Sequence, residues 1–111
     1  MSDKRIINNT QAHRFEIFVD DELAGYAEYR QEDSSVAFTH TIVEPQYKGK
    51  GVGSALANGA LDAVREAGGS ALPYCSFIRS YIQRRHPAYL ELAPADHWDE
   101  FALTPGDPTS D

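Results

Sequence analysis

The hydrophobic pattern of this chain changes once, between Pro45 and Gly53, and this change limits the folds open to it. Before Pro45, apolar and polar residues alternate, which is the pattern of half-buried β-strands. After it, apolar or small residues recur at helical spacing from Val52 to Ala67. Between the two lies the segment "EPQYKGKGVGSAL", with three glycines in five residues. The fold must therefore place a bare, bendable backbone between a strand and a helix.

Three segments before Pro45 are expected to be strands. They are Arg14–Val19, Leu23–Arg30 and Val36–Val43, and the short polar segments "DDE" and "QEDSS" separate them. Val36–Val43 is rich in β-branched residues, which favour strands. Short turns between successive strands predict an antiparallel three-strand meander.

The second half of the chain reads as helix, strand and helix. The first helix ends at the Gly68–Gly69 pair, and Ser70–Cys75 is a short strand. Ser76–His86 is a second helix that stops before a proline, and "AYLEL" (88–92) is a last short strand or turn. The order βββαβα predicts an α/β (α+β) fold with a mixed sheet. The strand–helix–strand crossover makes its two strands parallel neighbours.

Composition excludes several classes of protein. A chain of 111 residues with a net charge of −7 is expected to be one domain and no general nucleic-acid binder, and its charge favours a cationic partner. No apolar run reaches the ~20 residues that a membrane helix needs. The single cysteine, Cys75, and a polar N-terminus without a signal region predict a cytoplasmic protein. Residues 93–111 read as an acidic extension, disordered from about Thr104.

Glycines at a helix N-terminus suit an anion, because unpaired N–H groups and the positive end of the helix dipole point outward there. The segment is not a Walker A loop, since no Ser or Thr follows Gly49-Lys50. It is not the dinucleotide fingerprint either, because the third glycine comes one residue too soon. A tight turn without a ligand is the alternative. Lys48 and Lys50 give the segment a local positive charge.

The spacing Gln46-x-x-Gly49-x-Gly51 resembles the pyrophosphate loop of the Gcn5-related N-acetyltransferases. The segments "FTHTIVEPQYKGKGVGSAL" and "PYCSFIRSYIQRRHPAY" resemble the minimal, YjdJ-like branch of that superfamily. The resemblance covers residues 5–92, the expected domain. Larger members have helices between the first strands, and this sequence lacks them.

The resemblance implies an acetyl-CoA-dependent N-acetyltransferase that acts on a primary amine, either a protein lysine or N-terminus or a small cationic amine. The expected partners are acetyl-CoA and this acceptor, and the expected state is a monomer or weak homodimer. A backbone amide near Ile42 or Val43 would polarise the thioester carbonyl. The residues expected to contact acetyl-CoA are Ile42, Val43, Gln46, Tyr47, Lys48, Gly49, Lys50, Gly51, Val52, Gly53, Ser54, Ser76 and Arg79. A non-catalytic coenzyme A-binding module and a plain interaction domain are the alternatives.

Two residues are candidates for catalysis. Cys75 stands between the last strand and the second helix, where a helix N-terminus stabilises a thiolate. It is a nucleophile, a residue lining the pantetheine, or a small buried apolar residue. Strict alternation places His40 on the face of Phe38, as a general base or a core histidine. Tyr81 is read as core packing or as an acid for the thiolate.

Each remaining candidate residue has an interpretation without a function. Arg79, Arg84, Arg85 and His86 would contact the adenosine phosphates or lie on a solvated helix face. No cluster has metal-ligand spacing, so no metal is expected.

Overall fold

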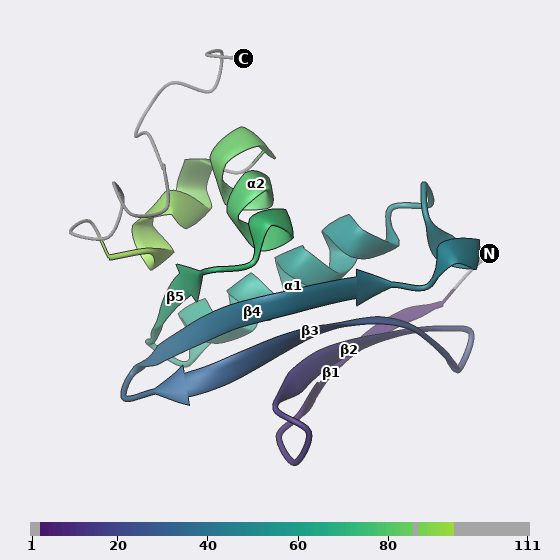
Figure 1. Cartoon of the computed structure of the whole chain (residues 1–111), viewed down its shortest axis with the longest axis horizontal. Helices are drawn as coiled ribbons and strands as arrows, with labels where there is room; N and C mark the ends of the chain where they lie inside the picture. The colour runs from purple at the N-terminus through teal and green to yellow at the C-terminus, as the bar shows by residue number, and fades with distance from the viewer. Residues whose placement is uncertain (1–2, 86, 95–111) are drawn as a thin grey trace.

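The computed structural model describes residues 3–85 and 87–94. Its sheet contains β1 (Lys4–Asn9), β2 (Arg14–Val19), β3 (Glu22–Glu32), β4 (Ser35–Val43) and β5 (Ser70–Pro73), in that spatial order. The helical elements are η1 (Pro45–Tyr47), α1 (Val52–Glu66), α2 (Ser76–Arg85) and η2 (Pro87–Leu92). The strands β1 to β4 pair antiparallel, and β5 joins β4 in parallel (Figure 1). The predicted mixed α+β architecture is therefore confirmed.

Two elements differ from the expectation. The strand β1 precedes the three predicted strands, so the order is ββββαβα and not βββαβα. Its sequence "KRIINN" lacks clear alternation and most of it is exposed, which is why no strand was predicted there. The segment 88–92 belongs to the 3-10 helix η2 and forms neither a strand nor a simple turn. The expected disordered end from about Thr104 lies outside the described residues.

The helix α1 packs on one face of the sheet, called here the inner face. Phe15 and Ile17 of β2 are buried there, as the alternation predicted. Beside Ile17, Ile6 of β1 lies so close to Gly59 of α1 that a Cβ at that glycine would come within 2.9 Å of it. In Figure 1 α1 runs behind the sheet, while α2 follows β5, the edge strand beside β4. α2 packs against η2, α1 and the β4–β5 strands.

A β-bulge in the β3–β4 pair divides β4 into two parts. Glu28 pairs with His40 and the next residue, Tyr29, pairs with Phe38, so Thr39 is an extra residue on β4. Neighbouring residues of a strand point to opposite faces, and directly paired residues share a face. Phe38 therefore lies on the inner face with Tyr29, and His40 lies on the opposite, outer face with Glu28. The expectation that His40 shares a face with Phe38 is wrong, because it assumed strict alternation.

Candidate functional site

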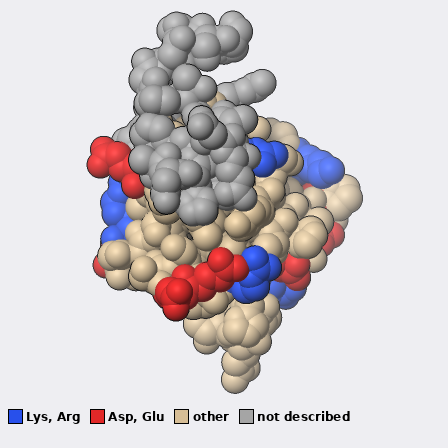
Figure 2. Space-filling model, turned by 60° about the vertical axis from the view of Figure 1, so that its left-hand side comes forward, with Lys and Arg blue, Asp and Glu red and all other residues tan. Residues whose placement is uncertain are grey.

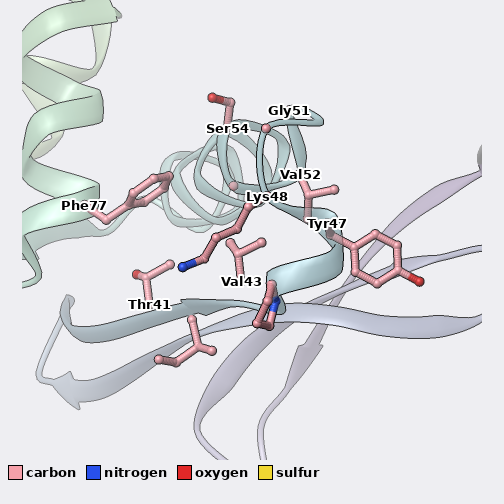
Figure 3. Close-up of a pocket in the computed structure, with 12 residues that line it drawn as sticks. Thr41, Val43, Tyr47, Lys48, Gly51, Val52, Ser54 and Phe77 are labelled. Carbon is pink, nitrogen blue, oxygen red and sulfur yellow. The ribbon is translucent and has the colours of Figure 1, made fainter.

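A cavity of about 620 Å³ lies where β4 ends and α1 begins (Figure 3). Its walls come from the end of β4, η1, the glycine loop, the first turn of α1 and one residue of α2. The lining residues are Thr41, Ile42, Val43, Pro45, Tyr47, Lys48, Gly49, Gly51, Val52, Gly53, Ser54 and Phe77. The sequence segment with the dense glycines is thus one wall of an open cavity.

Two of the three loop glycines are required by the backbone. Gly49 has a φ of 80° and Gly51 a φ of 77°, in the left-handed region that other residues adopt only at a cost. A Cβ added at either position would meet nothing within 4 Å, so the space beside both is open. Gly51 is also the N-cap of α1, without a side chain to cap the helix. The loop therefore turns tightly and still leaves its backbone accessible.

The backbone N–H groups of this loop are free to bind a ligand. The first N–H that bonds within α1 belongs to Ala55, which donates to the Gly51 carbonyl at 3.0 Å. Within the described chain, the N–H groups from Gly49 to Ser54 have no protein acceptor. The first turn of α1 contains no acidic residue to occupy the positive end of its dipole. This arrangement of N–H groups suits a phosphate-type anion.

The two side chains before the glycines point in different directions. In Figure 3 the Lys48 side chain runs along the cavity towards the side where Thr41 and Phe77 lie. The Tyr47 side chain points away from them, and its hydroxyl donates to Glu22 Oε1 at 2.7 Å. This hydrogen bond raises the pKa of Tyr47 above its usual range. Tyr47 therefore ties η1 to β3, and Lys48 supplies the positive charge inside the cavity.

Four of the expected acetyl-CoA contacts are not among the residues that line the cavity: Gln46, Lys50, Ser76 and Arg79. Lys50 lines a second, smaller cavity of about 290 Å³ together with Lys4, Asp20 and Glu22. Ser76 is exposed in the first turn of α2. The side chains of Arg84 and Arg85 and all of His86 lie outside the described residues.

The strands β4 and β5 pair only at one end. Their ladder runs from Ser35 to Phe38 on β4, and the Cys75 N–H extends it by donating to the Phe38 carbonyl at 2.9 Å. Beyond Phe38, β4 continues to Val43 without a described partner strand on that side. β4 thus has an open edge, and the cavity lies along it.

The backbone direction at the end of β4 distinguishes the two amides expected to face the ligand. The Glu44 N–H donates to the Ala24 carbonyl of β3 at 2.8 Å, so it points away from the open edge. Successive N–H groups of a strand point to opposite edges. The Val43 N–H therefore points to the open edge, while the Ile42 N–H points towards β3.

Cys75 lies next to the cavity and is buried, with 7% of its surface exposed. Its Sγ lies 3.1 Å from Oγ1 of Thr41, which lines the cavity. The Cys75 carbonyl accepts the Arg79 N–H at 3.0 Å, so Cys75 caps the start of α2. The Cys75 thiol therefore lies behind the side chain of Thr41, which lines the cavity.

His40 lies on the other side of the same strand edge. Its side chain is 72% exposed, and its Nδ1 lies 3.5 Å from Oε1 of Glu28. A core histidine would be buried, so that interpretation is wrong. Because Thr41 faces inward and His40 faces outward, the two residues lie on opposite sides of the open edge.

The sequence reasoning missed three lining residues: Thr41, Pro45 and Phe77. Thr41 looked like an ordinary strand residue, and its contact with Cys75 joins segments far apart in the chain. The helical spacing of Phe77 with Ile78, Tyr81 and Ile82 predicts a packed face, yet Phe77 is 40% exposed and lies over Gly53. Its position at the start of the helix, two residues after Cys75, is the one sequence signal for a place near the site.

Tyr81 is held away from the cavity lining. Its hydroxyl lies 3.4 Å from Oδ1 of Asn58 on α1, and its side chain is buried. Nearby, the Tyr89 hydroxyl lies 2.7 Å from Asn58 Oδ1 and 2.7 Å from Asp62 Oδ1. Burial and the hydrogen bond to Asp62 raise the pKa of Tyr89 to about 12. These hydrogen bonds fasten α2 and η2 to α1, which favours packing for Tyr81.

Residues 3–85 and 87–94 offer no candidate for a membrane span or a metal site. No helix of this part of the chain is long and apolar enough to cross a membrane. It contains no group of three His, Cys, Asp or Glu residues that could hold a metal ion. On the face in Figure 2, basic and acidic side chains lie near one another and neither sign forms a broad patch.

The comparisons with known proteins agree with this geometry. No curated protein sequence matches the chain. A family model described as GCN5-related N-acetyl-transferase matches residues 14–92, from the start of β2 to the end of η2. The match spans the glycine loop, the open edge of β4 and Cys75, and it covers most of the 111 residues. The chain therefore belongs to the GCN5-related N-acetyltransferase family.

Proposed function

We propose that this protein transfers the acetyl group of acetyl-CoA to a primary amine, which is a protein lysine or N-terminus or a small cationic amine. The observation that carries the proposal is the continuity of the cavity. At one end it meets the free N–H groups of the glycine loop, and at the other it meets the open edge of β4. An elongated substrate with an anionic end and a reactive end would fit this arrangement. The proposed domain is residues 5–92, and its proposed location is the cytoplasm.

The glycine loop is the proposed site for the pyrophosphate. Its N–H groups from Gly49 to Ser54 would bind the phosphate oxygens, and Lys48 would add a positive charge within the cavity. Phe77, which is exposed, and Val43, which is half-buried, would pack against the apolar arm between the pyrophosphate and the thioester. A protein with a net charge of −7 needs such a local site to hold a polyanion.

The open edge of β4 is the proposed reaction site. The Val43 N–H would donate a hydrogen bond to the thioester carbonyl and stabilise the negative charge that develops on its oxygen. The amine nitrogen bonds to the acetyl carbon, the carbon–sulfur bond breaks, and the sulfur leaves as a thiolate. His40 would accept the proton that the amine loses, because a neutral imidazole is a base near pH 7.

Cys75 would lie beside the sulfur of the bound thioester. Because its Sγ lies behind Thr41, we propose that the amine attacks the thioester directly and that Cys75 lines the reacting end of the cavity. The other route passes through Cys75: its thiolate takes the acetyl group, and the amine then attacks the new thioester. An acetyl group on Cys75 after incubation with acetyl-CoA alone would establish that route.

The test is calorimetric titration with acetyl-CoA and with CoA, using the variants Gly51→Glu and Gly68→Glu. Both glycines have nearly equal φ values, 77° and 76°, and a Cβ at either would meet nothing within 4 Å. The backbone cost of substitution is therefore matched. Only Gly51 lies in the loop, since Gly68 follows the other end of α1. A carboxylate at Gly51 would repel the pyrophosphate.

We expect the wild type and Gly68→Glu to bind both ligands and Gly51→Glu to lose them. Binding without turnover of any amine would favour a non-catalytic coenzyme A-binding module. A folded wild type that binds neither ligand would contradict both functions and leave the glycines as a turn.

A further inference from the structure

The outer face of the sheet carries an exposed pair beside the open edge of β4. Glu28 of β3 and His40 of β4 are directly paired across the strands, with side chains 44% and 72% exposed. The cavity and Cys75 lie on the inner side of the same edge. A thioester held at this edge is therefore open to a second substrate from the outer face.

Glu28 differs from its neighbours in what it binds. The outer face of β2 and β3 holds three carboxylates, those of Glu16, Glu28 and Glu32. Arg14 donates to Glu16 at 2.7 Å, and Arg30 donates to Glu32 at 2.6 Å. Within the described chain, the ion pair of Glu28 is with His40. Arg14 lies directly opposite Glu28 across the β2–β3 pair, but its ion pair is with Glu16 and its guanidinium lies over the Tyr26 ring. Of these three carboxylates, that of Glu28 is therefore the one without an arginine ion pair, and a ligand cation can approach it.

One exposed apolar side chain lies near this carboxylate. Ile42, which also borders the cavity, follows His40 on the outer face and is 45% exposed. A ligand that fits both groups has aliphatic carbons attached to a positive charge. An alkylammonium group, such as a lysine side chain or a polyamine, has this chemistry.

We propose that the acceptor binds on the outer face as an alkylammonium ion, with its charge at Glu28 and its carbons against Ile42. Glu28 is then a positioning residue as well. Its Oε1 lies 3.5 Å from Nδ1 of His40, and a small shift of these two exposed side chains would let it accept the Nδ1–H of the neutral imidazole. Nε2 would then carry no hydrogen and could take the proton of the amine. This inference rests on the proposed function, because it names the acceptor class of that reaction.

The matched pair of variants is Glu28→Gln and Glu32→Gln. Both remove one carboxylate from the same face of β3, but Glu32 pairs with Ser35, where β5 closes the edge of β4. The probe acceptor is lysine blocked at its α-amino and carboxyl groups. Since an exposed ion pair is worth up to about 1 kcal/mol, we expect the KM for this probe to rise about fivefold in Glu28→Gln. Glu32→Gln should keep the KM of the wild type, and both variants should keep the Kd for acetyl-CoA.

A second measurement follows the imidazole and needs no turnover. In ¹⁵N-detected NMR of the CoA-loaded protein at alkaline pH, His40 should carry its hydrogen on Nδ1 in the wild type and in Glu32→Gln. Glu28→Gln should increase the share of the Nε2–H tautomer, and Glu28→Asp should restore part of the original pattern. The blocked lysine should shift the His40 signals only where residue 28 is acidic.

The outcomes separate the two claims. Failure of the wild type to bind acetyl-CoA contradicts the proposed function, and this inference falls with it. Normal binding and turnover, with Glu28→Gln equal to Glu32→Gln in KM and in the NMR of His40, overturns this inference and leaves the proposed function intact. A raised KM with an altered tautomer supports it.

Discussion

The Phe77 ring of α2 lies directly over Gly53 in the first turn of α1. A Cβ at Gly53 would come within 2.8 Å of Cζ of that ring. The third glycine of the loop thus leaves room for this ring, whereas Gly49 and Gly51 are required by their φ angles. Phe77 and Gly53 both line the cavity.

We expect Gly53→Ala to weaken acetyl-CoA binding without destabilising the protein. The new methyl group must push the ring of Phe77 aside, which is easy because the ring is 40% exposed. Alanine in a helix is favoured over glycine by about 1 kcal/mol, which offsets the strain. Calorimetry and thermal unfolding measure the two effects. In the background of Phe77→Ala, the second substitution should cost no further affinity, and a cost there would place the effect elsewhere.

The buried thiol is expected to be dispensable for most of the turnover. Cys75→Ala removes a sulfur that lies behind Thr41, so we expect kcat to fall by less than about tenfold, or about 1.4 kcal/mol. Steady-state kinetics with the blocked lysine give kcat. A loss of about a thousandfold, with an acetyl group found on Cys75 of the wild type by mass spectrometry, would contradict direct attack.

The exposed imidazole is expected to matter for chemistry and not for coenzyme binding. We expect His40→Gln to lower kcat about a hundredfold, the usual contribution of a general base, with the Kd for acetyl-CoA unchanged. The charged group that faces His40 is Glu28, at 3.5 Å. The pH–rate profile is the second measurement. A profile that keeps its acid limb in His40→Gln would remove His40 from the mechanism.

Stability at high pH should depend on Tyr89. Burial and the hydrogen bond to Asp62 raise its pKa from 10.0 to about 12, so the folded state holds the phenol proton more tightly than the unfolded state does. The stabilisation is complete below pH 10 and is lost as the pH rises towards 12. We expect urea unfolding of Tyr89→Phe to show a smaller loss of stability between pH 9 and pH 11.5 than the wild type. Equal losses would mean that Tyr89 titrates alike in both states.

Much of the fold could be predicted from the sequence because each hydrophobic pattern lies within one short segment. The alternation in Arg14–Val19 and the helical spacing after Val52 predicted elements that the structure contains. The strand β1 was not predicted, since an edge strand needs no alternation when most of it is exposed. β1 forms by pairing with β2, and its own sequence carries no pattern that predicts this pairing.

Some features of the candidate site could likewise be predicted from the sequence, and others could not. The glycine loop could be predicted because left-handed backbone selects glycine, and the sequence shows where glycines gather. The contact between Thr41 and Cys75 could not, because it joins residues 34 positions apart. The side of the strand on which His40 lies could not either, because nothing in "FTHTIV" marks Thr39 as unpaired. That feature depends on how β3 aligns against β4.

The bulge at Thr39 determines on which face of the sheet the His40 imidazole lies. Before the bulge even-numbered residues such as Phe38 face inward, and after it odd-numbered residues such as Thr41 do. Deleting Thr39 would place His40 directly after Phe38, and both would keep their faces, because only the unpaired residue is lost. Inserting one residue in β3 between Glu28 and Tyr29 would instead give Thr39 a partner and impose strict alternation along β4. With the beginning of β4 held in place, His40 would then turn to the inner face and Thr41 to the outer face. One unpaired residue thus decides which side chains of β4 face the cavity.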